Sequence, residues 1–222
     1  MIDKLDKEVI YLLSQEPLDR LYSSGNPLIR WLLNRLINKT SDLLRKINAS
    51  SRSGLDVGCG EGNFIHHLRQ RNVIGPLVAI DLDDRKLELA KWQYPDCTYL
   101  NADIKNLNFK DNSFDYVIAS EVLEHIPAPF EAIRELQRVA KKDAYFIFSV
   151  PHEPFFHWGN VIRGKYWKRG GRTPTHVNFW RLSEFKRFIS GFVEIREVYW
   201  FSVFPWMLFL GKFKQDSVDA GL

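Results

Sequence analysis

Residues 55–64, LDVGCGEGNF, join a short apolar run to a turn with glycines at alternate positions. A turn of this kind between a strand and a helix is typical of nucleotide binding, because backbone N–H groups at the helix start face the ligand. The pattern alone is weak evidence, since glycines also serve turns that bind nothing. However, Asp81 lies 19 residues beyond Gly62, close to the ~20 expected of a carboxylate that binds ribose hydroxyls. The sequence therefore predicts a ligand that contains a ribose.

Charge indicates which nucleotide fits this turn. Asp56 precedes the first glycine by two positions, and Glu61 lies inside the turn. These carboxylates would repel the pyrophosphate of a dinucleotide, whereas they would attract a ligand with cationic sulfonium and ammonium groups. S-adenosylmethionine (SAM) has that charge distribution, so SAM is the expected cofactor.

Further polar residues follow later apolar runs. Asp103 is placed where a carboxylate can accept a hydrogen bond from an adenine amino group, and Ile104 can pack on the ring; an aspartate there also serves to cap a turn. Residues 120–125, SEVLEH, follow another apolar run. Folds with parallel sheets bind ligands at the carboxyl ends of their strands, so we expect this segment to reach the site.

The elements that must position these residues follow from periodicity. Asn26-Pro27 predicts a helix start, and apolar residues at helical spacing extend the helix over roughly 27–47. Short apolar runs then alternate with helical patterns, which indicates a parallel sheet with helices on both faces. The runs are 55–57, 77–80, 98–100, 114–119 and 144–150, and the helical patterns include 62–70, 84–92 and 129–140. The runs 191–200 and 206–213 are joined by too few residues for a crossover, so they should pair antiparallel at one edge.

In these motifs the sequence resembles the class I Rossmann-like SAM-dependent methyltransferases, and most of all the small-molecule branch that includes quinone-biosynthesis methyltransferases. LDVGCGEG, AIDLDD, NADI and NSFDYVIASEVLEHI carry the resemblance, densely over roughly 50–150. It implies a three-layer α/β sandwich with a mostly parallel seven-stranded sheet in the order 3-2-1-4-5-7-6 and an antiparallel edge. The implied cofactor-binding residues are Asp56, Gly58, Cys59, Gly60, Gly62, Asp81, Leu82, Asp103, Ile104, Ser120 and Glu121.

The acceptor is less constrained than the cofactor. An amino methylase of DNA bases would usually carry Pro-Pro and an aromatic residue after the fourth strand, where this chain has SEVL, so that class is disfavoured. Methyl transfer to oxygen or an activated carbon of a small-molecule or lipid-like acceptor is expected. Residues 163–172, RGKYWKRGGR, keep an RNA or protein acceptor open, because cations and aromatics suit phosphates and stacking. They also suit a solvated loop or an anionic small molecule. A protein that binds SAM without transferring methyl is the remaining alternative.

If the acceptor must lose a proton, histidine is the usual base near neutral pH. His125 follows the fourth strand and ranks first, because the resembled family has a histidine there beside its pocket. His152 follows the fifth strand and is the alternative, and His176 lies in a segment that could close over both. Each of them could instead be a structural histidine that holds a loop.

Length and composition indicate the domain organisation and the cellular location. A chain of 222 residues, 45% hydrophobic and 26% charged, fits one globular domain and excludes disordered and coiled-coil classes. We expect a helical segment over 1–49 and a methyltransferase domain over 50–222, with an irregular substrate cap at 151–182. Two cysteines, an N-terminus without a secretory pattern and no run of spanning length favour a cytoplasmic protein. The C-terminal aromatics and the N-terminal helix leave contact with a membrane surface open.

Overall fold

The computed structural model describes residues 22, 25–153, 157, 168, 175–200 and 206–214. The chain divides into two compact units, one ending at Asp103 and the other beginning at Ile104. The strand order is β3-β2-β1-β4-β5-β7-β6, as the family resemblance implied. Among the described residues, no helix has the length and apolar character that crossing a membrane requires.

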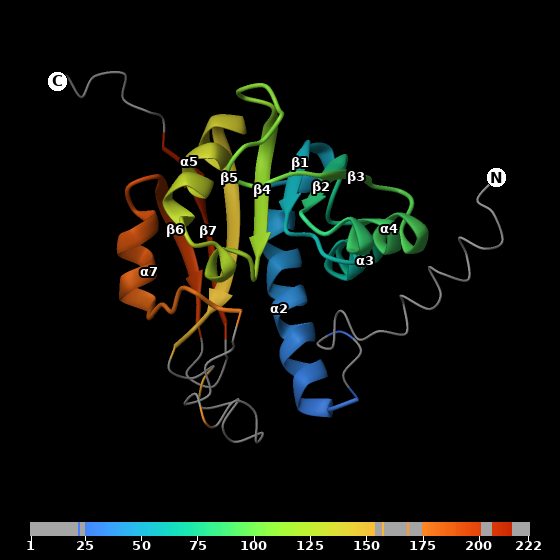
Figure 1. Ribbon diagram of the computed structural model, residues 1–222, viewed down its shortest axis with the longest axis horizontal. Helices are drawn as coiled ribbons and strands as arrows, with labels where there is room; N and C mark the ends of the chain where they lie inside the picture. Colours follow the sequence, from blue (N-terminus) through green and yellow to red (C-terminus); the bar gives the residue numbers. More distant parts are fainter. Residues whose placement is uncertain are drawn as a thin grey trace. The chain divides into compact units, whose positions relative to one another are not determined.

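The first unit contains three parallel strands and the helices that cover them (Figure 1). β1 pairs with β2 in parallel, and β2 pairs with β3 in parallel. All four residues of β1 are buried, which agrees with a strand covered on both faces. The elements are α2 (Pro27–Lys46), η1 (Ala49–Ser51), β1 (Gly54–Val57), α3 (Asn63–Gln70), β2 (Leu77–Asp81), α4 (Asp84–Gln93) and β3 (Thr98–Asn101).

Helix α2 begins where the sequence predicted. The side chain of Asn26 accepts hydrogen bonds from the backbone N–H groups of Leu28 and Ile29, and Pro27 takes the first helical position. This arrangement satisfies two of the N–H groups that a helix start leaves without partners. Most of the apolar stripe of the helix is buried, and Leu43 and Leu44 are fully inaccessible to solvent, whereas Leu28 at the helix start is 61% exposed.

The second unit contains the other four strands. β4 pairs with β5 in parallel, whereas β7 lies between β5 and β6 and is antiparallel to both. The predicted antiparallel pair is therefore confirmed, with β6 as the outermost strand. The elements are β4 (Phe114–Ser120), η2 (Leu123–His125), α5 (Pro129–Val139), β5 (Ala140–Pro151), α7 (Leu182–Ile189), β6 (Val193–Tyr199) and β7 (Trp206–Phe213).

Two features of this unit differ from the sequence expectations. Strand β5 begins at Ala140, directly after α5, where the sequence indicated a start at 144. Helix α7 follows the segment expected to be irregular and was not predicted. It packs on the sheet through Phe185, which is fully buried with its ring centroid 4.9 Å from that of Phe209 in β7. In Figure 1, α7 runs beside β6 and β7.

The C-terminal aromatics of β7 belong to the core. Trp206 is 3% exposed, Phe209 is inaccessible, and the strand is buried along almost its whole length. Successive residues of β7 point to opposite faces of the sheet and are nearly all buried, so both faces are covered and period-two exposure does not occur. These two aromatics therefore offer no surface to a membrane, and residues 201–205 lie outside the described residues.

Candidate functional site

The glycine turn has the backbone geometry that its residues predicted. Gly58, Gly60 and Gly62 all have positive φ, at 68°, 56° and 79°. Residues with side chains rarely adopt this region, so the alternating glycines are required by the path of the chain. The N–H of Cys59 donates to the carbonyl of Ile80, which fastens the turn to the end of β2.

The last and middle glycines face different surroundings. A Cβ on Gly62 would lie 3.0 Å from the ring of Tyr94 and 3.1 Å from the hydroxyl of Tyr99, so this position also needs glycine for packing. A Cβ on Gly60 would meet none of the described residues within 4 Å. The turn thus presents an open face at Gly60, where a ligand can approach the backbone.

Asp81 is bound to this turn through its side chain. Its Oδ2 accepts a hydrogen bond of 2.9 Å from the N–H of Gly60, and its Oδ1 accepts one of 3.0 Å from the N–H of Asp83. The carboxylate therefore lies beside the glycine turn, as expected for a residue that binds the ribose. The next residue, Leu82, leaves 66% of its apolar side chain exposed at the end of β2.

Asp56 lies in β1 and is only 3% exposed. Burial, reinforced by the charge of Asp81, raises the pKa of the Asp56 carboxyl to about 8. The group therefore holds its proton at neutral pH unless a cation approaches, because burial penalises the charged form. The sequence analysis treated Asp56 as a permanent negative charge, whereas the structure makes its charge depend on a nearby cation. A sulfonium or ammonium group nearby would restore that charge.

Cys59 and Cys97 are both free. Burial, followed by the charge of Asp56, raises the pKa of the Cys59 thiol, so Cys59 is a poor nucleophile and packs as a small apolar residue. Asp103 follows β3 and is half-buried in the first unit. Ile104 is 8% exposed and begins the second unit, so its predicted adenine contact stays a prediction.

In the second unit, Ser120 ends β4 and Glu121 follows it. The Ser120 hydroxyl lies 2.8 Å from the hydroxyl of Ser149 in β5, and Ser149 donates to Glu121 Oε1 at 3.2 Å. Glu121 has a positive φ of 59°, which is strained for a residue with a side chain. Burial raises its pKa to about 8. The structure thus joins these predicted residues into one hydrogen-bonded chain of side chains.

Two of the three candidate bases come together after β4. The rings of His125 and His176 meet edge to face, with centroids 4.8 Å apart. The carboxylate of Glu124 lies beside them, and one ligand atom from each of the three residues falls within 4.8 Å of the other two. Burial lowers the pKa of His176 to about 4, and the neighbouring His125 and His157 add to this effect. His176 is therefore neutral at physiological pH.

The third candidate base lies in a different setting. His152 directly follows β5 and packs edge to face on Trp200, which directly follows β6, with ring centroids 4.7 Å apart. Burial lowers the pKa of His152, so it too is neutral near pH 7. Both residues line a cavity of about 520 Å³. The other lining residues are Glu153, Arg181, Leu182, Ser183 and Lys186.

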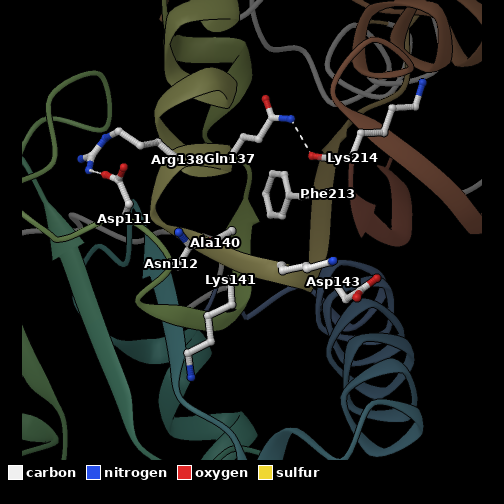
Figure 2. Close-up of a pocket in the computed structure, with 10 residues that line it drawn as sticks. Asp111, Asn112, Gln137, Arg138, Ala140, Lys141, Asp143, Phe213 and Lys214 are labelled. Atoms are coloured by element: carbon white, nitrogen blue, oxygen red, sulfur yellow. Dashed lines mark hydrogen bonds and ion pairs between the residues drawn. The ribbon is translucent and has the colours of Figure 1, made fainter. Parts of the chain in front are cut away.

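A second cavity, of about 360 Å³, lies at the opposite end of these strands (Figure 2). Its lining includes Asn112, just before β4, and Ala140, the first residue of β5. Figure 2 shows Arg138 paired with Asp111 on one side and Gln137 bonded to the carbonyl of Lys214 on the other. Because α/β folds bind ligands at the carboxyl ends of parallel strands, this cavity is not the expected site.

Sequence reasoning missed several residues of these groups. Glu124 was not singled out, although a carboxylate next to His125 and three residues after Glu121 was visible in the motif. The sequence predicted Trp200 to be an aromatic residue of an edge strand, and it gave no functional prediction for Arg181 or Lys186. Of the basic residues in the segment 163–172, which lies in the predicted cap, Lys168 is exposed. Arg163, Lys165, Arg169 and Arg172 lie outside the described residues, so the cap stays a prediction.

A glycine turn with strand-end carboxylates, on a sheet with this order, defines the class of SAM-dependent methyltransferases with a Rossmann-like fold. Comparison with known proteins gives the same result. Residues 55–148 match the family described as methyltransferase domain. Residues 55–148 therefore form a class I SAM-dependent methyltransferase domain, and SAM is the cofactor that this family implies.

The relatives include proteins with two kinds of name. An uncharacterized methyltransferase of Schizosaccharomyces pombe is 35% identical over 41% of this chain and 37% of its own length. A demethylmenaquinone methyltransferase of Staphylococcus saprophyticus is 30% identical over 51% of this chain and 52% of its own length. The chain therefore spans about half or less of these relatives. A solved SAM-dependent methyltransferase from Methanosarcina mazei shares the fold, with a TM-score of 0.62 at 18% identity over 77% of this chain and 96% of its own.

Proposed function

We propose that the chain is a SAM-dependent methyltransferase that methylates oxygen or an activated carbon of a small-molecule or lipid-like acceptor. The observation that carries the acceptor class is the cavity of about 520 Å³ at the carboxyl ends of β5 and β6. Pockets for small organic ligands usually measure about 300–1,000 Å³. The name of the Staphylococcus saprophyticus relative, demethylmenaquinone methyltransferase, supports an acceptor of this kind.

The lining of the cavity indicates what the acceptor looks like. Trp200 supplies an apolar aromatic wall, and it is 36% exposed. Arg181 and Lys186 supply positive charge from the start and the middle of α7. An aromatic or apolar body with an anionic or ionisable oxygen matches both features, since the ring can stack on Trp200 while the cations attract the oxygen.

The cofactor would be held by the glycine turn and Asp81 in the first unit. Two observations support the fit: the open face at Gly60, where no atom of the described ranges would lie within 4 Å of a Cβ, and the exposed apolar side chain of Leu82 beside Asp81. SAM supplies the activated methyl group when it is bound. The protein then has two tasks, which are to align the acceptor and to accept its proton where it has one.

His152 fits the second task. It lines the cavity, and burial keeps its imidazole neutral, the form that can accept a proton. A lowered pKa makes it a weaker base than a solvated histidine, which suits an acceptor hydroxyl that is itself acidic, such as that of a phenol or quinol. His125, which the sequence ranked first, is the alternative base.

Incubation of the purified protein with SAM and separate pools of quinols, phenols, lipids and RNA tests this proposal. The readout is the S-adenosylhomocysteine formed in each pool. We expect turnover with the quinol, phenol or lipid pool. Turnover with RNA alone would replace the acceptor class by the nucleic-acid alternative, and SAM binding without turnover in any pool would favour a non-catalytic SAM-binding protein.

A further inference from the structure

The side chain of Glu124 is buried without a hydrogen-bond partner among the described residues. It is 1% exposed, and within the described part of the chain neither carboxylate oxygen has a hydrogen-bond donor. Burying a carboxylate costs much free energy unless a cation or hydrogen bonds compensate it. The proposed methyl transfer gives this group no role, so its environment requires another explanation.

The imidazole of His125 is fixed beside this carboxylate in one tautomer. Its Nδ1 lies 3.0 Å from the backbone carbonyl of Thr175. A carbonyl only accepts hydrogen bonds, so Nδ1 carries the hydrogen and Nε2 of the neutral ring bears the lone pair. That Nε2 lies 3.9 Å from Glu124 Oε1, which is too long for a hydrogen bond. A histidine that donates one N–H to a carbonyl and directs the other nitrogen at a carboxylate has the arrangement of a metal ligand.

The backbone holds the third residue, His176, against the other two. The N–H groups of Val177 and Asn178 both donate to the carbonyl of Glu124, at 2.9 and 3.1 Å. The Asn178 side chain donates to the carbonyls of Leu123 and Ile126, at 3.1 and 2.7 Å. These four hydrogen bonds fasten residues 175–178 to the turn after β4, so the cluster is assembled before any ligand binds.

We propose that Glu124, His125 and His176 bind a divalent first-row transition ion of the Zn²⁺ type. Two imidazoles and one carboxylate are the donors of three-residue zinc sites, whereas Mg²⁺ and Ca²⁺ prefer oxygen alone. Ligands about 2.1 Å from a tetrahedral ion are about 3.4 Å apart. The three ligand atoms already lie within 4.8 Å of one another, so closure by about an ångström completes the site.

Three protein ligands leave at least one coordination position of such an ion open. His125 is 41% exposed at its side chain, so water or an acceptor oxygen can reach the cluster. An oxygen bound to the ion would lose its proton more readily, because the cation stabilises the anion. Metal binding itself does not depend on the proposed methyl transfer, which the formation of S-adenosylhomocysteine tests separately.

Titration of the chelator-treated full chain with Zn²⁺, and with Co²⁺ as a spectroscopic probe, tests this proposal. We expect one ion per chain by calorimetry and visible absorption from tetrahedral Co²⁺. Glu124→Gln and His176→Asn should each weaken binding at least about tenfold. Glu88→Gln and His66→Asn, which change the same residue types on α4 and α3, should bind as the unchanged protein does.

Thermal unfolding separates metal binding from a structural role. Zn²⁺ should raise the Tm of the unchanged protein, since a ligand that binds only the folded state stabilises it. Metal-free Glu124→Gln should unfold at an equal or higher Tm, because the amide has nearly the shape of the carboxyl group and carries no charge that burial could penalise. Zn²⁺ should no longer raise this Tm. Zn²⁺ binding that is absent, or equally strong in Glu124→Gln and His176→Asn, would overturn the proposal, as would a Zn²⁺-induced Tm rise preserved in both variants.

Discussion

The Asp81 carboxylate accepts a hydrogen bond of 2.9 Å from the backbone N–H of Gly60, across 21 positions of sequence. The same carboxylate is the predicted partner of the ribose. Its position therefore depends on the glycine turn, and the turn in part depends on it.

Asp81→Ala should weaken both SAM and S-adenosylhomocysteine by roughly 1.5–3 kcal/mol, the value of a hydrogen bond to a charged group. Asp81→Asn should lose less, because its remaining carbonyl oxygen can still accept from Gly60. Calorimetry measures both variants, and Asp96→Asn, at an exposed position in the same unit, is the control. Unchanged SAM affinity in Asp81→Ala would remove this residue from the cofactor site.

Gly60→Ala should mainly weaken SAM binding, whereas Gly62→Ala should mainly lower the stability of the protein. Both place a side chain at positive φ, which costs roughly 1–2 kcal/mol. Gly62→Ala also forces a Cβ against Tyr94 and Tyr99, so it should lower stability further. The new Cβ of Gly60→Ala meets no described atom within 4 Å, so this variant should lose less stability. It should instead weaken SAM binding more than Gly62→Ala does, because the methyl group lies on the open face of the turn. Urea unfolding and SAM titration of the two variants provide the comparison. Equal loss of stability in both would contradict it.

Stability should fall as pH rises from about 6.5 to 8. The raised pKa of Asp56, about 8, means that the folded protein keeps a proton there that the unfolded chain has lost. The folded state then binds more protons, and the free energy of unfolding decreases with pH, by at most about 1.4 kcal/mol per unit for one group. Asp56→Asn should reduce this slope, and Glu121, whose pKa is also raised to about 8, contributes to the slope that remains. His176, with a pKa of about 4, acts in the other direction and only below its ordinary value of 6.5. An unchanged slope in Asp56→Asn, measured by urea unfolding, would refute the assignment.

Lys186 and Arg187 are neighbours on α7, both exposed, but only Lys186 lines the cavity. Lys186→Gln should raise the KM of an anionic acceptor several-fold, with kcat little changed, because it removes attraction without touching the reacting atoms. Added salt should reduce this difference. Arg187→Gln should behave as the unchanged protein. If both variants raised the KM equally, the acceptor would be attracted by the overall positive charge of the surface and not by Lys186 in the cavity.

His152→Ala should lower kcat by ~10² to 10⁴ while SAM affinity stays nearly intact, as expected for a base. The same measurement on His125→Ala tests the alternative, which the sequence favours. If neither substitution matters, the acceptor arrives already ionised and alignment alone is needed. If His152→Ala lowers Tm with normal turnover, the imidazole only packs on Trp200.

The sequence predicted the strands well because each is a short apolar run between turn residues, and buried parallel strands have that composition. It missed α7, although Leu182, Phe185, Phe188 and Ile189 recur at helical spacing. The helix follows a long basic and aromatic stretch, and that composition suggested an irregular segment. Helix formation here depends on burial of Phe185 against β7, a tertiary contact that local composition does not contain.

The glycine turn and Asp81 could be placed from spacing alone, because consecutive elements of a βαβ unit fix where strand ends meet. The pairing of His125 with His176 could not. It depends on the hydrogen bonds that Val177 and Asn178 donate to the carbonyl of Glu124, and hydrophobic periodicity does not predict such long-range backbone contacts. The burial of Glu124 was also invisible, since a charged residue after a strand is ordinarily assigned to solvent.

The place of β7 between β5 and β6 constrains the order in which the sheet can assemble. β6 is paired only with β7 in the described structure, although it precedes β7 along the chain. During synthesis, β6 therefore leaves the ribosome before the strand that it needs as a neighbour. It must wait unpaired, or held only by α7, until residues 206–213 emerge. Final closure of the cavity at His152 and Trp200, which directly follow β5 and β6, is then a late folding event.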